Sequence, residues 1–290
     1  MSNTNTERMQ SQQQPFASET PNGIKKRFEY LSGVLGRFRP KNVLDFGAGT
    51  GTNLTIPLAQ LFPETRFLGV DNDQASVDYA NSVNTTSNLS FAMIDESDRY
   101  APYDMIIASE VIEHVDEPGE LLLYLRGMLA PGGRMILTMP NGYGPFEMTA
   151  FAESLLFVSG IHTLLHKIAA AALGKKGSRP TKADTLAVSP HVNFFSHGRI
   201  KGLIGAAGFD ILEYRPRTFV CGLGFHQLLF NESARLWNAR VADSLPPQAN
   251  SGWMFVLQKN ERTAPATIPY KRGLYERMRK YLNAKRWGLI

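Results

Sequence analysis

The residues best suited to chemistry in this sequence stand together in the segment Glu110-Val-Ile-Glu113-His114. Two carboxylates and an imidazole at positions i, i+3 and i+4 share one side of a helical turn. The apolar run over residues 103–108 predicts a buried parallel strand, so the three side chains should lie at its carboxyl end, where ligands bind. Because a histidine titrates near neutral pH, we predict His114 as general base, with Glu110 beside it as the second catalytic residue.

A second candidate site is the glycine loop within residues 43–54. An apolar strand leads into Gly47, Gly49 and Gly51, and an apolar helical segment follows. Only a residue without Cβ readily takes a positive φ and lets a ligand lie against the backbone. Thr52 stands where a dinucleotide-binding fingerprint has its last glycine, which disfavours NAD or FAD. The alternative is a tight strand-to-helix turn that binds nothing.

The carboxylate of Asp71 ends a second apolar strand twenty residues after Gly51. A carboxylate at that position can accept both hydrogen bonds of a ribose diol. With the glycine loop, this arrangement resembles the class I S-adenosylmethionine (SAM) methyltransferases over about residues 40–258. The first and second motifs of that family are similar to Asp45-Phe-Gly47-Ala-Gly49-Thr-Gly51 and Gly69-Val-Asp71.

The resemblance implies SAM as the cofactor and a set of residues that contact it. In the family, a carboxylate at the place of Asp95 holds the adenine amine, although Asp is also an ordinary turn residue. The residues implied to contact the cofactor are Asp45, Gly47, Gly49, Gly51, Asp71, Asn72, Asp95 and Ser109.

The segment 110–115 resembles that of the ubiquinone-biosynthesis O-methyltransferases. In some of them, and in small-RNA 2′-O-methyltransferases, a Glu-x-x-Glu-His set with a later histidine holds Mg²⁺, which lowers the pKa of the acceptor hydroxyl. The matching residues are Glu110, Glu113, His114 and His191. Carboxylates suit Mg²⁺, but two imidazoles are softer ligands than this ion prefers. The wider family carries Glu-His here without a metal, so a histidine base and a metal site both stay open.

Strands and helices alternate five times along the chain, which predicts an α/β fold with a doubly wound parallel sheet. The resemblance implies a Rossmann-like sheet of seven strands in the order 3-2-1-4-5-7-6, with strand 7 antiparallel. We expect a disordered N-terminus over 1–23, a methyltransferase domain over 24–259 and a basic C-terminal tail over 260–290. A helical insertion over about 147–190, after strand 5, is either a lid or a helix that lies on a membrane.

Charge and cysteine content set limits on partners and compartment. The chain of 290 residues has a net charge of +5 and one cysteine, so no intrachain disulfide forms and a cytoplasmic location is expected. Residues 271–290 carry seven Lys or Arg against one Glu. This basic segment is either a solvated tail that binds nothing or a contact with an anionic membrane or nucleic acid. The (Asp/Asn)-Pro-Pro-aromatic motif of base-amine methyltransferases is absent, which disfavours nucleic acid. The sequence indicates no oligomeric state.

We therefore predict a SAM-dependent methyltransferase that acts on an oxygen of a small or lipid-linked acceptor, by in-line transfer with base or metal assistance. One alternative is a glycan- or N-directed methyltransferase of the same fold. An alternative of another class is a membrane-associated SAM-binding module without catalysis.

Overall fold

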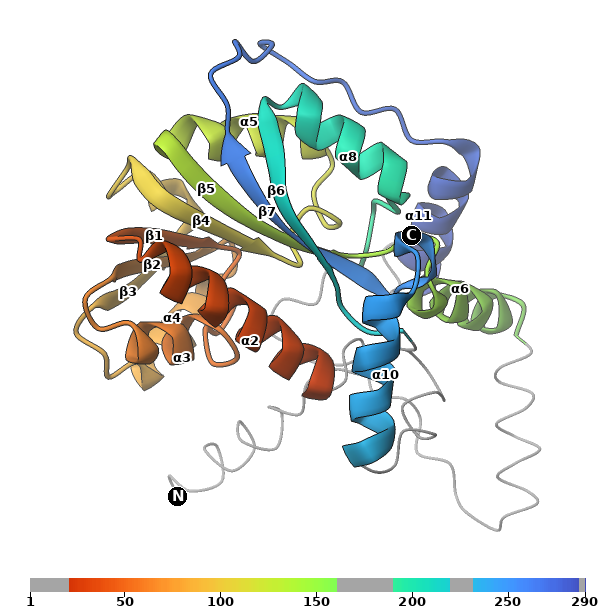
Figure 1. Cartoon of the computed structure of the whole chain (residues 1–290). Helices are drawn as coiled ribbons and strands as arrows, with labels where there is room; N and C mark the ends of the chain where they lie inside the picture. Colours follow the sequence, from red (N-terminus) through yellow and green to blue (C-terminus); the bar gives the residue numbers. More distant parts are fainter. Residues whose placement is uncertain (1–20, 161–189, 220–231, 287–289) are drawn as a thin grey trace.

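A seven-stranded sheet forms the centre of the computed structural model, which describes residues 21–160, 190–219, 232–286 and 290 (Figure 1). The strand order is β3-β2-β1-β4-β5-β7-β6, and only β7 runs antiparallel to its neighbours within this sheet. The predicted order and direction of the strands are confirmed. The strands are β1 (Asn42–Phe46), β2 (Arg66–Asp71), β3 (Leu89–Met93), β4 (Tyr103–Ser109), β5 (Leu129–Pro140), β6 (Phe209–Pro216) and β7 (Gly252–Lys259).

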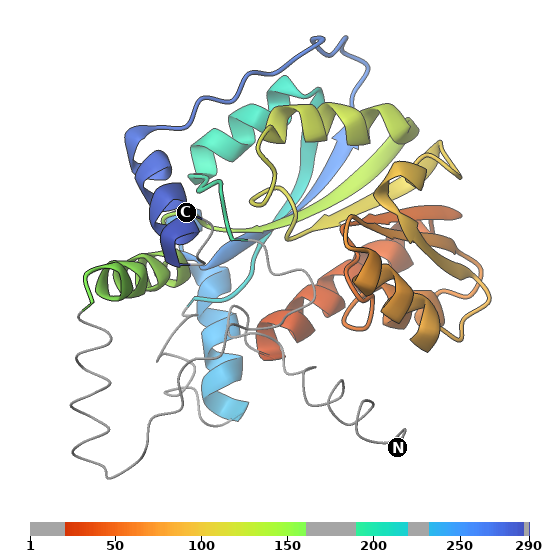
Figure 2. The same cartoon turned by 180° about the vertical axis from the view of Figure 1, so that it is seen from behind.

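Helices cover both faces of the sheet, as Figures 1 and 2 show from opposite sides. Helices α2, α3 and α4 pack on one face, and α5 and α8 pack on the other. The helices are α2 (Pro21–Phe38), α3 (Thr55–Leu61), α4 (Gln74–Val83), α5 (Pro118–Met128), α6 (Pro145–Val158), α8 (His197–Ala206), α10 (Glu232–Ser244) and α11 (Leu274–Arg286).

Strand β4 shows why the central strands are apolar without interruption. Ile106 and Ala108 face the core beneath α5 and α8, whereas Met105 and Ile107 face the core beneath α2, α3 and α4. Because helices exclude water from both faces, neither set of alternating positions tolerates an unpaired polar side chain. The polar residues that follow β4 therefore come at the edge of the sheet, where the loops meet.

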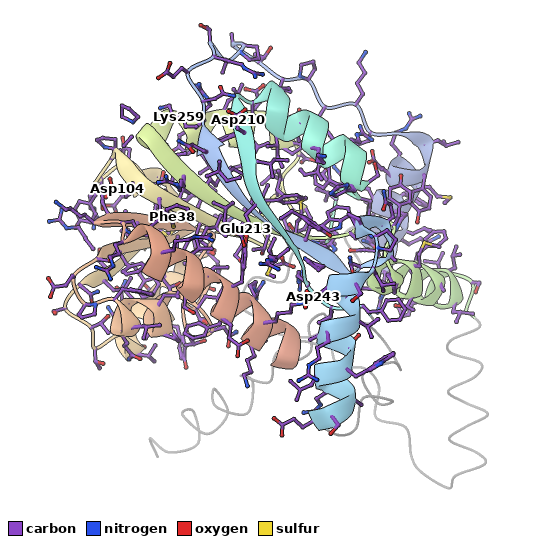
Figure 3. All side chains as sticks on the ribbon, in the orientation of Figure 1. Phe38, Asp104, Asp210, Glu213, Asp243 and Lys259 are labelled. Atoms are coloured by element: carbon purple, nitrogen blue, oxygen red, sulfur yellow. The ribbon has the colours of Figure 1, made fainter. Side chains whose placement is uncertain are left out.

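Helix α2 leads into the first strand and is tied to the far edge of the sheet. It begins at Pro21, inside the segment 1–23 that we expected to be disordered, and residues 1–20 lie outside the described part of the chain. Arg37 donates to Glu213 on β6 at 2.6 Å, and Lys26 donates to Asp243 on α10 at 2.8 Å. Glu213 and Asp243 both lie beside α2 in Figure 3. Helix α2 thus joins the start of the first strand to β6 at the far edge of the sheet and to α10.

The insertion after β5 is described only in its first part. Helix α6 follows β5 directly, in agreement with the helical periodicity of the sequence. Most of the remaining residues of the predicted insertion, 161–189, lie outside the described ranges. The prediction of a lid or a membrane helix falls on these residues and stays a prediction. No helix among the described residues has the length and apolar character needed to cross a bilayer.

The chain after β7 turns back onto the domain and ends in α11, which lies beside α6 (Figure 1). A solvated tail was one of the alternatives that the charge of residues 271–290 left open, but Glu276 and Arg279 of α11 are each only 1% exposed. Both oxygens of Glu276 accept from Nη1 of Arg199 at 2.8 Å. The charges of Glu276 and Arg279 can be buried because each is paired with a charged residue on another helix. The sequence of the segment by itself does not reveal these partners.

Candidate active site

The glycine loop between β1 and α3 has the left-handed backbone that its sequence predicts. Gly47, Gly49 and Gly51 have φ of 78°, 55° and 68°. A Cβ on Gly47 would lie 2.5 Å from Val111, and one on Gly51 would lie 2.3 Å from the ring of Phe91. A Cβ on Gly49 would meet no atom of the structure within 4 Å. Two of the glycines are therefore needed for packing, and Gly49 borders open space.

Asp71 holds the glycine loop in place from the end of β2. Its Oδ2 accepts from the N–H of Gly49 at 2.7 Å, and its Oδ1 accepts from the N–H of Asp73 at 3.0 Å. Each carboxylate oxygen has two lone pairs, so both can accept a further hydrogen bond from a ligand. Asn72 beside it and Asp95 after β3 are exposed at the same edge of the sheet.

Asp45 and Ser109, both predicted to contact a cofactor, make contacts within the protein. Asp45 is buried and accepts from Oγ1 of Thr55, the first residue of α3, at 2.6 Å. Burial raises the pKa of Asp45 to about 6, and the hydrogen bond from Thr55 opposes the shift. Oγ of Ser109 lies 2.9 Å from Oγ1 of Thr138 on β5. Asp45 thus anchors the helix that follows the glycine loop.

Glu110 takes a position that differs from the predicted one. The chain forms a turn after β4 in place of a helix, and Glu110 has a left-handed φ of 59°. Its Oε2 accepts from Arg217 at 2.6 Å, its Oε1 accepts from Thr138 at 2.8 Å, and Nη1 of Arg27 lies 3.7 Å from Oε1. Burial would raise the pKa of Glu110, but Arg217 and Arg27 more than offset it and hold the pKa below its ordinary value. Glu110 is thus an ionised carboxylate held by two arginines.

Glu113, His114 and His191 form the cluster of potential metal ligands among the described residues, and Glu110 is not part of it. One ligand atom from each lies within 4.8 Å of the others. Nε2 of His114 is 4.0 Å from Oε1 of Glu113, and the two imidazole rings meet edge to face with centroids 4.8 Å apart. Glu113 is 1% exposed, and in the described structure neither of its carboxylate oxygens has a hydrogen-bond partner. The turn after β4 thus presents a buried, unsatisfied carboxylate next to two imidazoles.

Backbone contacts bring His191 to this turn from a distant part of the sequence. The N–H groups of Val192 and Asn193 both donate to the carbonyl of Glu113, at 2.8 and 3.0 Å. The side chain of Asn193 donates to the carbonyls of Ile112 and Val115, at 3.0 and 2.6 Å. The segment after residue 190 is therefore tied to both sides of the turn that carries Glu113.

The environment sets different protonation states in the cluster. Burial, and then the charge of Glu110, raise the pKa of Glu113 to about 8. Burial, and then the charge of His191, lower the pKa of His114 to about 4, so His114 does not titrate near neutrality as its residue type suggested. Burial would lower the pKa of His191, but Glu147 raises it to about 9. At neutral pH the cluster thus contains a neutral Glu113, a neutral His114 and a charged His191.

Four residues of this region were missed in the sequence because each is paired with a distant partner. Arg27 stands four residues before Leu31 on the buried side of α2. A cation at a helix position that faces the core indicates a buried partner of opposite charge, and this pattern is visible in the sequence. Arg279 likewise stands three residues before the buried Leu282. The missed residues are Arg27, Glu147, Arg217 and Arg279.

Comparison with known proteins assigns the chain to a family. The profile of a family described as a methyltransferase domain matches residues 16–214. The chain belongs to the class I SAM-dependent methyltransferases. A putative sarcosine dimethylglycine methyltransferase from Galdieria sulphuraria has the same fold, with a TM-score of 0.51 and 12% identity over 84% of this chain and 93% of that one.

Curated relatives share a shorter stretch with this methyltransferase. The trans-aconitate 2-methyltransferase of Methylobacterium radiotolerans is 33% identical over 105 residues, which cover 35% of this chain and 39% of that protein. The ubiquinone biosynthesis O-methyltransferase of Bradyrhizobium diazoefficiens is 33% identical over 120 residues, which cover 40% of this chain and 46% of that protein. The chain thus spans less than half the length of these relatives.

Two alanine substitutions in the glycine loop should separate packing from ligand binding. Gly49→Ala should lower the free energy of unfolding by only about 1–2 kcal/mol, the strain of a left-handed alanine, yet sharply weaken SAM binding, because its methyl group fills the open space. Gly51→Ala should cost roughly 1–3 kcal/mol more in stability, since the ring of Phe91 must move. Chemical denaturation and SAM titration calorimetry measure the two effects. Unchanged SAM affinity in Gly49→Ala would show that the ligand lies elsewhere.

Proposed function

We propose that this chain transfers a methyl group from SAM to an oxygen of a small or lipid-linked acceptor. The observation that carries the proposal is the cluster of a buried Glu113 with the half-buried His114 and His191 at the carboxyl edge of the sheet, next to the glycine loop. Two similar proteins are named as O-methyltransferases, one of ubiquinone biosynthesis and one acting on malonyl-[acyl-carrier protein], which supports an oxygen acceptor.

The residues around the glycine loop fit SAM. Gly49 borders open space, Asp71 has lone pairs left for a ribose diol, and Asp95 is exposed where the adenine amine would be held. SAM supplies a methyl group on a sulfonium, an electrophile that is already activated. The protein therefore has to orient the acceptor and exclude water from it.

Removal of the acceptor proton is the step for which the cluster is suited. His114 is neutral at physiological pH, but the burial that lowers its pKa also makes it a weak base. It can accept a proton when a negative charge lies beside it, and Glu113 supplies that charge once its carboxyl group is ionised. Glu110, which we predicted as a catalytic residue, is engaged by Arg217 and Arg27. We assign it the role of fixing the turn that presents Glu113 and His114.

The same three residues also fit a divalent cation. Both oxygens of Glu113 are buried, and the described part of the chain gives them no donor, which is the arrangement expected of a carboxylate that binds an ion. A bound cation would supply a Lewis acid that lowers the pKa of the acceptor hydroxyl. With Glu110 engaged elsewhere, the donor set is one carboxylate and two imidazoles. This set suits Zn²⁺ or Mn²⁺ better than the Mg²⁺ that the resemblance left open.

Two further functions remain as alternatives. A glycan- or N-directed methyltransferase would use the same cofactor residues with another acceptor. A SAM-binding module without catalysis would keep the glycine loop and Asp71 and would have no use for the cluster.

SAM binding should depend on Asp71. Asp71→Ala should weaken SAM binding by about 1–3 kcal/mol, because hydrogen bonds to a charged group are lost. Part of this loss comes from the glycine loop, since Asp71 also holds the N–H of Gly49. Titration calorimetry measures the affinity, with Asp78→Ala on the exposed side of α4 as control. Equal affinity in parent and Asp71→Ala would exclude the ribose contact, and binding of NADH would contradict the family's cofactor.

Variants of the cluster should separate a histidine base from a metal site. The assay follows transfer of a labelled methyl group from SAM to a panel of phenols, carboxylic acids and lipid-linked phenols. If His114 alone accepts the proton, His114→Ala should lower kcat by about 10²–10⁴ with SAM affinity unchanged. Chelation should then have no effect. His197→Ala, which removes a histidine outside the cluster, should behave like the parent.

A metal site would give a different pattern in the same assay. A chelator should abolish transfer, and Zn²⁺, Mn²⁺ or Mg²⁺, each added back alone, should identify the ion. Glu113→Ala and His191→Ala should then be nearly as damaging as His114→Ala, since each removes a ligand. If all three variants retain activity within roughly tenfold of the parent, about 1.4 kcal/mol, the cluster has no catalytic role.

We also propose that α11 provides the contact with an anionic membrane that the charge of the sequence suggested. Leu274, Met278 and Tyr281 are exposed at spacings of four and three residues, so they share the outer side of the helix. Arg277 and Lys285 are exposed beside them. An apolar stripe flanked by cations is the pattern of a helix that lies on anionic lipid. The end of α6 adds the exposed Leu155, Leu156 and Phe157.

Substitutions on the outer side of α11 test this contact without damaging the fold. Deletion of 271–290 would also remove the buried Glu276 and Arg279, so Met278→Asp with Tyr281→Asp is the better variant. The parent should bind vesicles that contain acidic lipid and be released by salt, because exposed charges are screened beyond about 8 Å at physiological ionic strength. The double variant should remain in the supernatant. Leu61→Asp, an exposed position on α3, is the control, and equal sedimentation of all three proteins would contradict the proposal.

A further inference from the structure

The C-terminal helix α11 reaches the cluster through a buried carboxylate. Nη2 of Arg279, which is 1% exposed, lies 2.5 Å from Oε2 of Glu147 on α6. The other oxygen of Glu147, Oε1, lies 2.5 Å from Nδ1 of His191. A single carboxylate, itself 2% exposed, therefore joins α11 to a histidine of the proposed active site.

The guanidinium of Arg279 is fixed by further contacts. Its Nη1 donates to the carbonyl of Gly142 at 2.8 Å, and its Nη2 donates to the carbonyl of Glu147 at 2.7 Å. Its central carbon lies 3.9 Å from the ring centroid of Phe194. Because a planar guanidinium with this many partners has one orientation, the carboxylate that it binds has one orientation too.

The backbone around His191 is held by the same C-terminal segment. The side chain of Asn283 on α11 donates to the carbonyl of His191 at 3.2 Å. Nε of Arg272 donates to the carbonyl of Val192 at 3.2 Å, and the N–H of Val192 in turn donates to the carbonyl of Glu113. The C-terminal segment thus contacts the main chain of His191 directly and reaches its side chain through Glu147.

A purely structural role would not require this arrangement. A buried ion pair contributes little net stability, and apolar side chains of similar volume often replace one without loss. Moreover, α11 lies beyond residue 214, where the match to the family profile ends. An element outside the matched region therefore supplies Arg279, which binds Glu147, and Glu147 in turn binds a histidine of the cluster.

We propose that Glu147 and Arg279 are positioning residues that hold His191 in the active site. Glu147 accepts the hydrogen bond from Nδ1, so Nε2 is the nitrogen left for the acceptor or for an ion. Nε2 donates while His191 is charged, and it binds an ion only after its own proton is lost. A histidine that donates to a carboxylate in this way keeps one tautomer and one ring orientation. The proposal rests on the proposed function, in that the cluster is taken as the catalytic centre.

The first measurement is nuclear magnetic resonance of the histidine rings in the full chain. In the parent, Nδ1–H of His191, assigned by its absence from His191→Gln, should exchange slowly with water. Arg279→Met should speed this exchange at least tenfold, because Glu147 is no longer held. Arg277→Met, two residues away on the exposed side of the same helix, should leave the signal unchanged.

A double variant distinguishes positioning from stability. Glu147→Leu with Arg279→Met removes both buried charges, so its thermal stability should return toward that of the parent. The Nδ1–H signal should nevertheless be lost. In the methyl-transfer assay kcat should fall about 10–100-fold, while KM for SAM stays unchanged. A double variant with the kcat of the parent would overturn the proposal.

Two other outcomes would also overturn it. One is an Arg279→Met protein that is folded and shows the same His191 exchange as the parent. The other is loss of SAM binding in Arg279→Met, since α11 would then support the whole domain and not the histidine. Failure of the proposed function looks different: the parent itself would bind no SAM, or His114→Ala would leave methyl transfer intact.

Discussion

The burial of charge at the carboxyl edge of the sheet is the constraint on which the site depends. Helices cover both faces of the sheet, so the polar residues that follow the strands are gathered at one edge and largely removed from water. Each ionisable group there either finds a partner or changes its protonation state. Glu110 is paired with Arg217 and remains ionised, whereas Glu113 has no hydrogen-bond donor among the described residues and burial raises its pKa to about 8. Two carboxylates three residues apart thus acquire opposite properties.

Segments from distant parts of the chain satisfy this constraint. Arg27 comes from the helix before the first strand, Arg217 from the residues after β6, and Arg279 from the last helix. Each places its guanidinium against a carboxylate at the edge of the sheet. The shared methyltransferase domain is therefore enclosed at its active edge by elements that precede and follow the central strands.

The glycine loop and the cluster around Glu113 differ in their packing. At the glycine loop, the side chains of Asp45 and Asp71 accept hydrogen bonds from Thr55 and from the N–H of Gly49, and Gly49 borders open space. At the cluster, the carboxylate of Glu113 is buried and has no donor among the described residues. The glycine loop is held in one conformation and has space for a polar ligand. The cluster has unsatisfied groups that an acceptor or an ion would complete.

Local patterns in the sequence determined the glycine loop, the acidic end of β2 and the pairing of Glu113 with His114. These features depend on residue spacing along one strand, one turn or one motif, and spacing is fully contained in the sequence. The sheet order and the addition of His191 to the pair came from the resemblance to a known family. The tertiary structure alone decided that Glu110 leaves this group, that His114 is too buried to titrate near neutrality, and that Arg279 belongs to the core and not to a tail. The physical reason is that desolvation and ion pairing depend on which side chains meet after folding. Arg217 is distant in sequence from Glu110, and Arg279 from Glu147, so no local pattern indicates that these charges will meet.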